Sequence, residues 1–166
     1  MKRLIMTILA SAALCFAAEA QSDLKKVYDE SIDPMTQIDK AIAKADKDGK
    51  FVICQVGGNW CRWRLMFADF ISKDSEITEL IDKNFEYIHV NFNPRERNDE
   101  AKMKKAETML ARLGNPGRFG YPVFVVLDGD GKVIHIQDSS LLEEGNGYNK
   151  SKVMRFFSNW TPAAVK

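Results

Sequence analysis

Residues 51–70 read FVICQVGGNWCRWRLMFADF, and the rest of the chain is interpreted around them. The first six residues are almost continuously apolar, which is typical of a strand covered on both faces of a sheet. A glycine-rich turn follows, and apolar side chains then recur at helical spacing, at Met66, Phe67, Phe70 and Ile71. We therefore predict a strand, a tight turn and a helix that begins beside Cys61.

Cys61 lies where this predicted helix begins. The first backbone N–H groups of a helix have no partner within the helix, and the positive end of the helix dipole lies there. A thiolate is favoured in such a position, and Arg62 and Arg64 add positive charge nearby. We therefore expect Cys61 to be the reactive residue of the chain.

The segment Trp60-Cys61 after a buried strand, together with GYPVFVVLD at residues 120–128, resembles the thioredoxin family. The family usually carries Trp-Cys-x-x-Cys, and secreted members often carry Trp-Cys-x-Trp-Cys. This chain reads Trp60-Cys61-Arg62-Trp63-Arg64, so Arg64 stands where the second cysteine would be. The resemblance covers roughly residues 34–162 and implies a thioredoxin-like α/β fold, a three-layer sandwich with a mixed sheet and helices on both faces.

The same resemblance implies roles for three further residues. Pro122 matches the cis-proline of the family, so Tyr121-Pro122 is expected to be cis, with Tyr121 presenting the backbone that pairs with a bound peptide. Many thioredoxins carry a buried carboxylate six residues before the first cysteine, which moves protons for the second one. Gln55 stands there in this chain, so the two departures from the family pattern, Gln55 and Arg64, agree with each other.

The other elements follow from apolar spacing, caps and breakers. Asp33-Pro34 starts a helix that Gly49 ends, and a further short helix follows a break at residues 73–76. We predict a strand over 85–92, a helix over 96–113, a hairpin of strands 123–127 and 132–137, a loop over 141–149 and a helix over 151–160. Strands joined by a helix are parallel, and the hairpin is antiparallel.

The first 20 residues have the pattern of a secretory signal peptide. Lys2-Arg3 precedes an apolar run over 4–18, and Ala18-Glu19-Ala20 is a small-x-small cleavage site. Lipidation at Cys15 is disfavoured because Leu14 is bulkier than the small residue that such processing prefers. We expect an exported protein, periplasmic or extracellular, with a polar lead-in over 21–33, a thioredoxin-like domain over 34–162 and no integral membrane segment after cleavage.

The composition limits the classes of binding partner that we expect. The 166 residues are 45% hydrophobic and carry a formal charge of +1, so one domain is expected and no strong field would recruit nucleic acid. Cys54 and Cys61 are expected to be free thiols, with Cys54 buried and inert. His89 and His135 lack a second ligand at suitable spacing, so we expect no metal and no cofactor.

Two functions remain open from the sequence. In the first, Cys61 exchanges thiols with protein or glutathione disulfides through mixed disulfides, and an external thiol completes the release because Arg64 cannot. In the second, the chain is a redox-inactive module that binds an extended peptide or assists folding through Trp63, Arg64 and Tyr121. Trp60 is expected to pack beside the turn, whereas Trp63 is a candidate partner contact; with Cys61 unused, Arg64 would be a solvated helix residue.

Overall fold

A computed structural model describes residues 24–96 and 98–166. The expected signal peptide therefore lies outside the described residues. The α-helices are α2 (Pro34–Asp48), α3 (Arg62–Lys73), α4 (Ser75–Asn84), α5 (Glu100–Arg112), α6 (Lys150–Asn159) and α7 (Pro162–Val165), with the short 3-10 helices η1 (Pro116–Phe119) and η2 (Ser139–Leu142). The strands are β1 (Phe51–Gly57), β2 (Phe85–Asn91), β3 (Val123–Leu127), β4 (Val133–Asp138), β5 (Glu143–Glu144) and β6 (Gly147–Tyr148). Within those ranges no helix is both long and apolar enough to cross a bilayer.

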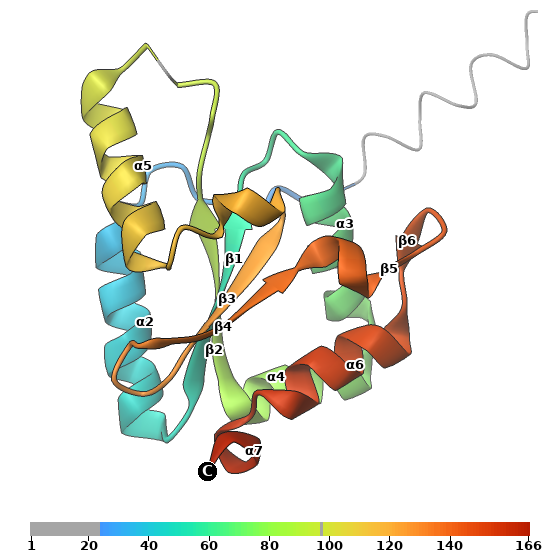
Figure 1. Cartoon of the computed structure of the whole chain (residues 1–166). Coiled ribbons are helices and arrows are strands. Elements are labelled where there is room, and N and C mark those ends of the chain that lie inside the picture. The colour runs from blue at the N-terminus through green and yellow to red at the C-terminus, as the bar shows by residue number, and fades with distance from the viewer. Residues whose placement is uncertain (1–23, 97) are drawn as a thin grey trace, which may run out of the picture.

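The main sheet is mixed, in the strand order β2-β1-β3-β4 (Figure 1). Strand β1 pairs in parallel with β2, from Phe51 opposite Phe85 to Gly57 opposite Asn91. Strand β3 is antiparallel to both β1 and β4. The carboxyl ends of β1 and β2 therefore lie at the same end of the sheet as the start of β3. This brings Gly57 and Val123 close to each other.

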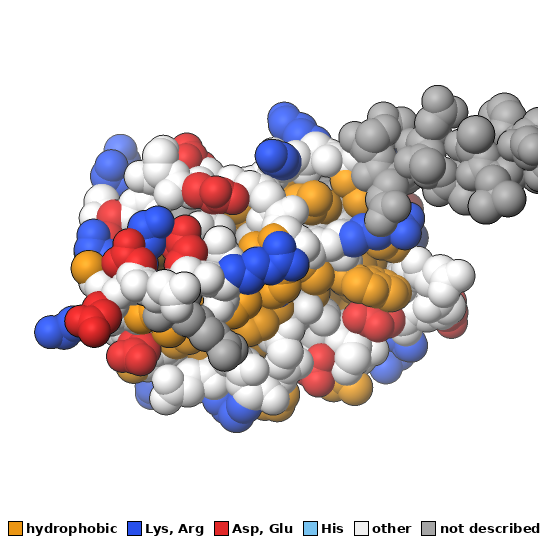
Figure 2. Space-filling model, turned by 90° about the horizontal axis from the view of Figure 1, so that it is seen from above, with side chains coloured by type: hydrophobic (Ala, Val, Ile, Leu, Met, Phe, Trp, Pro, Cys, Tyr) orange, Lys and Arg blue, Asp and Glu red, His pale blue; other side chains and the backbone are white. Residues whose placement is uncertain are grey.

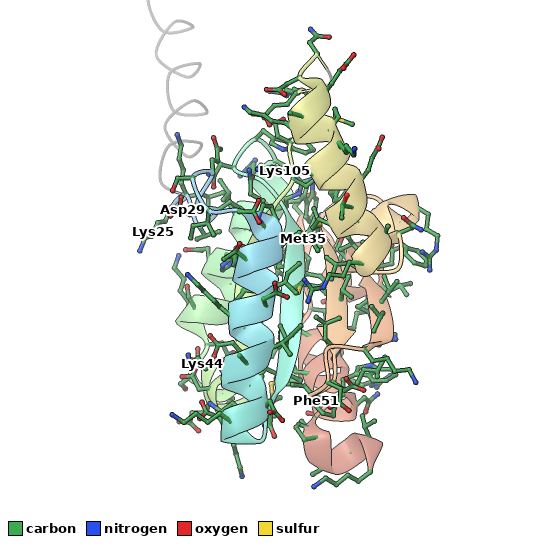
Figure 3. The ribbon with its side chains drawn as sticks, turned by 90° about the vertical axis from the view of Figure 1, so that its left-hand side faces the viewer. Lys25, Asp29, Met35, Lys44, Phe51 and Lys105 are labelled. Atoms are coloured by element: carbon green, nitrogen blue, oxygen red, sulfur yellow. The ribbon has the colours of Figure 1, made fainter. Side chains whose placement is uncertain are left out.

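Helices cover both faces of this sheet, as predicted. Side chains from α2 and α5 pack with alternate residues of β1 and β3 on one face, in a core that includes Ile38, Val52, Cys54, Met109 and Val125. Figure 3 shows α2 and α5 side by side over this face, with the labelled Met35 and Lys105 between them. Helices α3, α4 and α6 pack on the other face, in a core that includes Ile53, Phe67, Ile77, Phe124 and Phe157.

Local signals set the ends of several helices. The carboxylate of Asp33 accepts a hydrogen bond of 3.1 Å from Thr36 N, and Gly49 ends α2 with a φ of 65°. Asp74 caps α4 in the same way, through Ile77 N at 3.2 Å. These caps satisfy backbone groups that would otherwise lack partners, so the predicted start and end of α2 are confirmed.

The segment expected to be a loop over 141–149 is more ordered than predicted. It contains part of η2 and the small antiparallel hairpin β5–β6, which turns at Gly145 with a φ of 58°. The ring of Tyr148 packs edge-on against Phe67 of α3, with the ring centroids 4.8 Å apart. Strands of two residues carry no periodic signal, so contact with α3 rather than local sequence stabilises this hairpin.

Candidate functional site

Cys61 is the N-cap residue of α3 and is partly exposed. Its backbone N–H donates to the carbonyl oxygen of Gly58 at 3.3 Å, and its own carbonyl oxygen accepts from Arg64 N at 3.3 Å. Cys54 is fully buried, and both cysteines are free, as expected. Burial raises the pKa of Cys54 to about 12, so that thiol is unreactive and Cys61 is the accessible one of the two.

Arg64 lies inside the protein, with an exposed fraction of 0%. Its guanidinium carbon is 3.8 Å from the centre of the Trp60 ring and 5.0 Å from that of Tyr121. The expectation that Arg64 is solvated is therefore wrong. A long side chain at the first turn of a helix can fold back towards the preceding turn, and the two aromatic faces stabilise its charge there.

Gly57 provides the space for Arg64. A Cβ atom at Gly57 would overlap Arg64 Cδ, and it would lie 2.5 Å from Arg64 Nε and 2.9 Å from the hydroxyl oxygen of Tyr28. The end of β1 can therefore carry no side chain while Arg64 keeps this position. Gly57 and Gly58, predicted to form a turn, therefore also leave room for the buried Arg64 side chain.

The charge of Arg64 is affected by both burial and its neighbours. Burial lowers the pKa of the guanidinium from its ordinary value, because a charged group is poorly solvated there. Cys61 has the largest opposing effect, followed by Tyr28, Tyr121 and Tyr148. An arginine remains protonated in proteins, so the site holds a permanent positive charge three residues after Cys61.

Gln55 fixes the first turn of α3 to the sheet. Its side chain is fully buried; Nε2 donates to the carbonyl oxygen of Arg64 at 3.1 Å, and Oε1 accepts from the hydroxyl of Tyr87 at 2.6 Å. A neutral amide can serve both partners at once, whereas a carboxylate offers no donor to the Arg64 carbonyl. Gln55 therefore positions the helix that carries Cys61 and Arg64.

The lead-in segment contributes a residue that the sequence analysis did not predict. Tyr28 is only 4% exposed, and its ring contacts His89 edge-on at 5.3 Å. Its backbone N–H donates to Asn59 Oδ1 at 3.1 Å, and its carbonyl oxygen accepts from Asn59 Nδ2 at 2.8 Å. Asn59 thus ties the turn before Cys61 to the lead-in segment 31 residues earlier, a pairing that no local pattern reveals.

The segment before β3 lies at the same end of the sheet. The Tyr121-Pro122 peptide bond is cis, and the ring of Tyr121 packs on Phe92 at 5.0 Å as well as facing Arg64. Trp60 Nε1 donates to the carbonyl oxygen of Phe92 at 3.1 Å. The turn before Cys61, the residue after β2 and the residue before Pro122 therefore meet around Arg64.

Trp63 contacts the hairpin β5–β6 through Tyr148. Its ring meets Tyr148 edge-on at 5.7 Å, and the hydroxyl of Tyr148 donates to the carbonyl oxygen of Trp63 at 3.1 Å. Trp63 remains partly exposed, whereas Arg62 is exposed to solvent. Seen from above relative to Figure 1, towards the ends of the strands, hydrophobic side chains form a band between separate groups of charged side chains (Figure 2).

The family comparison agrees with this geometry. The profile of the family Thioredox_DsbH, described as a protein of unknown function, DUF255, matches residues 15–156. The chain belongs to this family. Membership and the observed sheet together establish a thioredoxin-like fold, as the resemblance implied.

Two solved structures are similar to this family member. One is a disulphide isomerase from Xylella fastidiosa Temecula1, with 28% identity and a TM-score of 0.64, over 82% of this chain and 97% of that chain. The other, a DsbH oxidoreductase, has 20% identity and a TM-score of 0.52, over 81% and 84% of the two chains, and supports the fold alone. No curated protein matches the chain.

Proposed function

We propose that this protein is an exported thioredoxin-fold protein that exchanges protein or glutathione disulfides through the single thiol of Cys61. The observation that carries the proposal is the partly exposed cysteine at the N-cap of α3, with the buried cation of Arg64 three residues later. A helix N-terminus and a nearby cation both favour the thiolate, which is the nucleophile of disulfide exchange. The similar disulphide isomerase supports the same class of reaction.

The reaction would proceed without net oxidation or reduction. The Cys61 thiolate attacks one sulfur of a substrate disulfide, forms a mixed disulfide and releases the other sulfur as a thiolate. A different thiol of the substrate, or glutathione, then attacks the mixed disulfide and returns Cys61 as a thiolate. Arg64 occupies the position of a resolving cysteine, and buried Cys54 does not reach the surface, so the second attack must come from outside the chain.

Substrate would bind across the segment before β3. Tyr121 lies beside Arg64 and Phe92, and Pro122 follows it as a buried residue. Trp60, Trp63 and Tyr121 are partly exposed. Aromatic side chains of this kind contact partner chains without selecting a particular charge. We therefore assign Tyr121 and Pro122 to substrate binding, with Trp60, Arg62, Trp63 and Arg64 as neighbours of the catalytic Cys61.

Export follows from the first 20 residues in this proposal. Cleavage after Ala20 would leave Gln21 as the first residue and place the protein in a compartment where disulfides form. Mass spectrometry of the exported fraction tests this. A product that begins at Gln21 supports cleavage at this site, whereas an intact Met1 overturns it.

Trapping of mixed disulfides tests the exchange itself. Cells that express the wild-type protein, Cys61→Ser or Cys54→Ser are quenched with acid, and thiol-linked adducts are separated without reductant. Adducts that depend on Cys61 and persist in Cys54→Ser support exchange. Equal patterns for the wild type and Cys61→Ser overturn it, and favour a redox-inactive module that binds peptides through the same face.

A further inference from the structure

The guanidinium of Arg64 is a buried charge with few polar partners. Its Nη1 lies 3.5 Å from the carbonyl oxygen of Gly58, and in residues 24–96 and 98–166 its Nε has no hydrogen-bond partner. Across the same ranges, none of the ion pairs with carboxylates includes Arg64. A buried cation without an anion is strongly destabilising, and contact with Trp60 and Tyr121 offsets only part of that effect.

The ionisable groups around Arg64 come from every element packed against it. They are Cys61 and Arg62 on α3, Tyr28 in the lead-in, Tyr121 before β3, Tyr148 on β6, and Arg95 on the far side of Trp60. Burial raises the pKa of Tyr28, Tyr121 and Tyr148, so these three hydroxyls stay neutral at neutral pH. Arg62 and Arg95 are cations. Cys61 is the remaining group that can supply a negative charge.

We propose that Arg64 is the fixed counter-ion of the Cys61 thiolate, and that its charge makes Cys61 a good leaving group when an external thiol resolves a mixed disulfide. The ion pair is inferred from the burial of Arg64 and from the contact of Arg64 Nη1 and Cys61 N with the same carbonyl oxygen, that of Gly58, at 3.5 and 3.3 Å, whereas its role in release rests on the proposed exchange function. In a dithiol enzyme the second cysteine releases the substrate by attacking the mixed disulfide. In this protein the charge of Arg64 would promote that release by stabilising the departing Cys61 thiolate.

The chemistry of the release step shows where the charge is needed. An external thiolate attacks the substrate sulfur of the mixed disulfide, a new disulfide forms, and the electron pair of the broken bond moves to the Cys61 sulfur. Negative charge therefore develops beside the guanidinium. In the mixed disulfide that sulfur is neutral and Arg64 has no anion, so the bound intermediate is disfavoured relative to the free thiolate.

The expected magnitude follows from a shared contact. Cys61 N and Arg64 Nη1 lie 3.3 and 3.5 Å from the carbonyl oxygen of Gly58, so the guanidinium lies beside the residue that carries the thiol. An opposite charge within about 4 to 6 Å of an ionisable group changes its ionisation equilibrium about 10- to 1000-fold. When Cys61 attacks, about half of this effect, on a logarithmic scale, is cancelled because a more stable thiolate is a weaker nucleophile. Loss of the Arg64 charge should therefore slow alkylation of Cys61 about 3- to 30-fold, and release, in which Cys61 is the leaving group, by about as much.

Matched variants test the charge. The variants are Arg64→Met, which keeps the length without the charge, Arg64→Lys, which keeps a charge, and Arg155→Met as a control at an exposed arginine on α6, outside the site. Two rates are measured at pH 7: alkylation of Cys61 by iodoacetamide, and release of glutathione from the glutathionylated protein by dithiothreitol. We expect both rates to fall 3- to 30-fold in Arg64→Met, to recover largely in Arg64→Lys, and to change less than twofold in Arg155→Met. Equal rates in the wild type and Arg64→Met, or equal losses in Arg64→Met and Arg155→Met, overturn the proposal.

The change in Tm on capping Cys61 distinguishes an ion pair from a purely structural role of Arg64. Capping Cys61 with a neutral methylthio group removes the anion, so the Tm of the wild-type protein should fall, and this fall should be absent in Arg64→Met. Equal shifts in the two proteins overturn the ion pair, whether or not Arg64→Met is less stable in itself. If the alkylation and Tm results hold but the wild type forms no mixed disulfides in cells, the ion pair stands and the proposed exchange function fails.

Discussion

The substitution Gly57→Ala tests the packing of the whole site. A Cβ atom at this position would overlap Arg64 Cδ and lie 2.5 Å from Arg64 Nε. Movement of the Arg64 side chain would disturb its contact with Trp60, whose ring centre is 3.8 Å from the guanidinium carbon. Overpacking of this kind costs about 1 to 3 kcal/mol. Alanine also lowers the conformational entropy of the unfolded chain, which stabilises the folded state by about 0.4 to 1 kcal/mol.

With the middle of each range, the net expectation for Gly57→Ala is a loss of about 1.3 kcal/mol, or about 3 to 5 °C in Tm for a domain of this size. The matched control is Gly147→Ala on β6, where an added Cβ meets no atom within 4 Å and stability should change by less than about 0.5 kcal/mol. Differential scanning calorimetry measures both. In an Arg64→Ala background the cost at Gly57 should shrink, because the overlapping atoms are gone. If Gly57→Ala is as stable as Gly147→Ala, Arg64 does not occupy the position described.

Three further predictions concern the groups that hold the site together. Burial lowers the pKa of His89 from 6.5 to about 4, so between these pH values the unfolded chain binds a proton that the folded chain excludes. Stability should therefore fall as the pH drops from 6.5 to 4, by up to about 3 kcal/mol, and urea titrations of His89→Phe should show a smaller fall. Asn59→Ala removes both hydrogen bonds to Tyr28 and should cost about 1 to 2 kcal/mol, with faster proteolysis near Tyr28; an unchanged cleavage rate would show that the lead-in is held by other contacts. Gln55→Leu leaves the Tyr87 hydroxyl and the Arg64 carbonyl without their partner and should cost about 2 to 4 kcal/mol, measured by the urea midpoint; a loss below 1 kcal/mol would contradict the anchoring role of Gln55.

Much of the fold was predictable because its signals are local. The apolar run that forms β1, the Asp33 cap and the left-handed Gly49 act within a few residues of one another. The order of strands and helices then restricts the sheet to a mixed arrangement with both faces covered. The hairpin β5–β6 was missed for the opposite reason, since its stability comes from the contact of Tyr148 with α3.

Arg64 shows where reasoning from sequence reaches its limit. Spacing along the helix places this residue on the same face as the buried Phe67 and Ile71, but the usual exposure of arginine favours solvent. The structure buries it because three separate features coincide: a glycine at the end of β1, the ring of Trp60 on one side and that of Tyr121 from a distant loop. No one of these features is unusual in the sequence, and their proximity exists only after the sheet has formed.

The sequence by itself determined that a thiol without a nearby second thiol begins a helix after a buried strand, because helix caps, apolar periodicity and residue identity are properties of short segments. Tertiary structure alone decided what surrounds that thiol: a buried cation in the place of a second cysteine, and Tyr28 bound to the turn through Asn59. The physical reason is that the cost of burying a charge depends on the groups that the whole fold places around it.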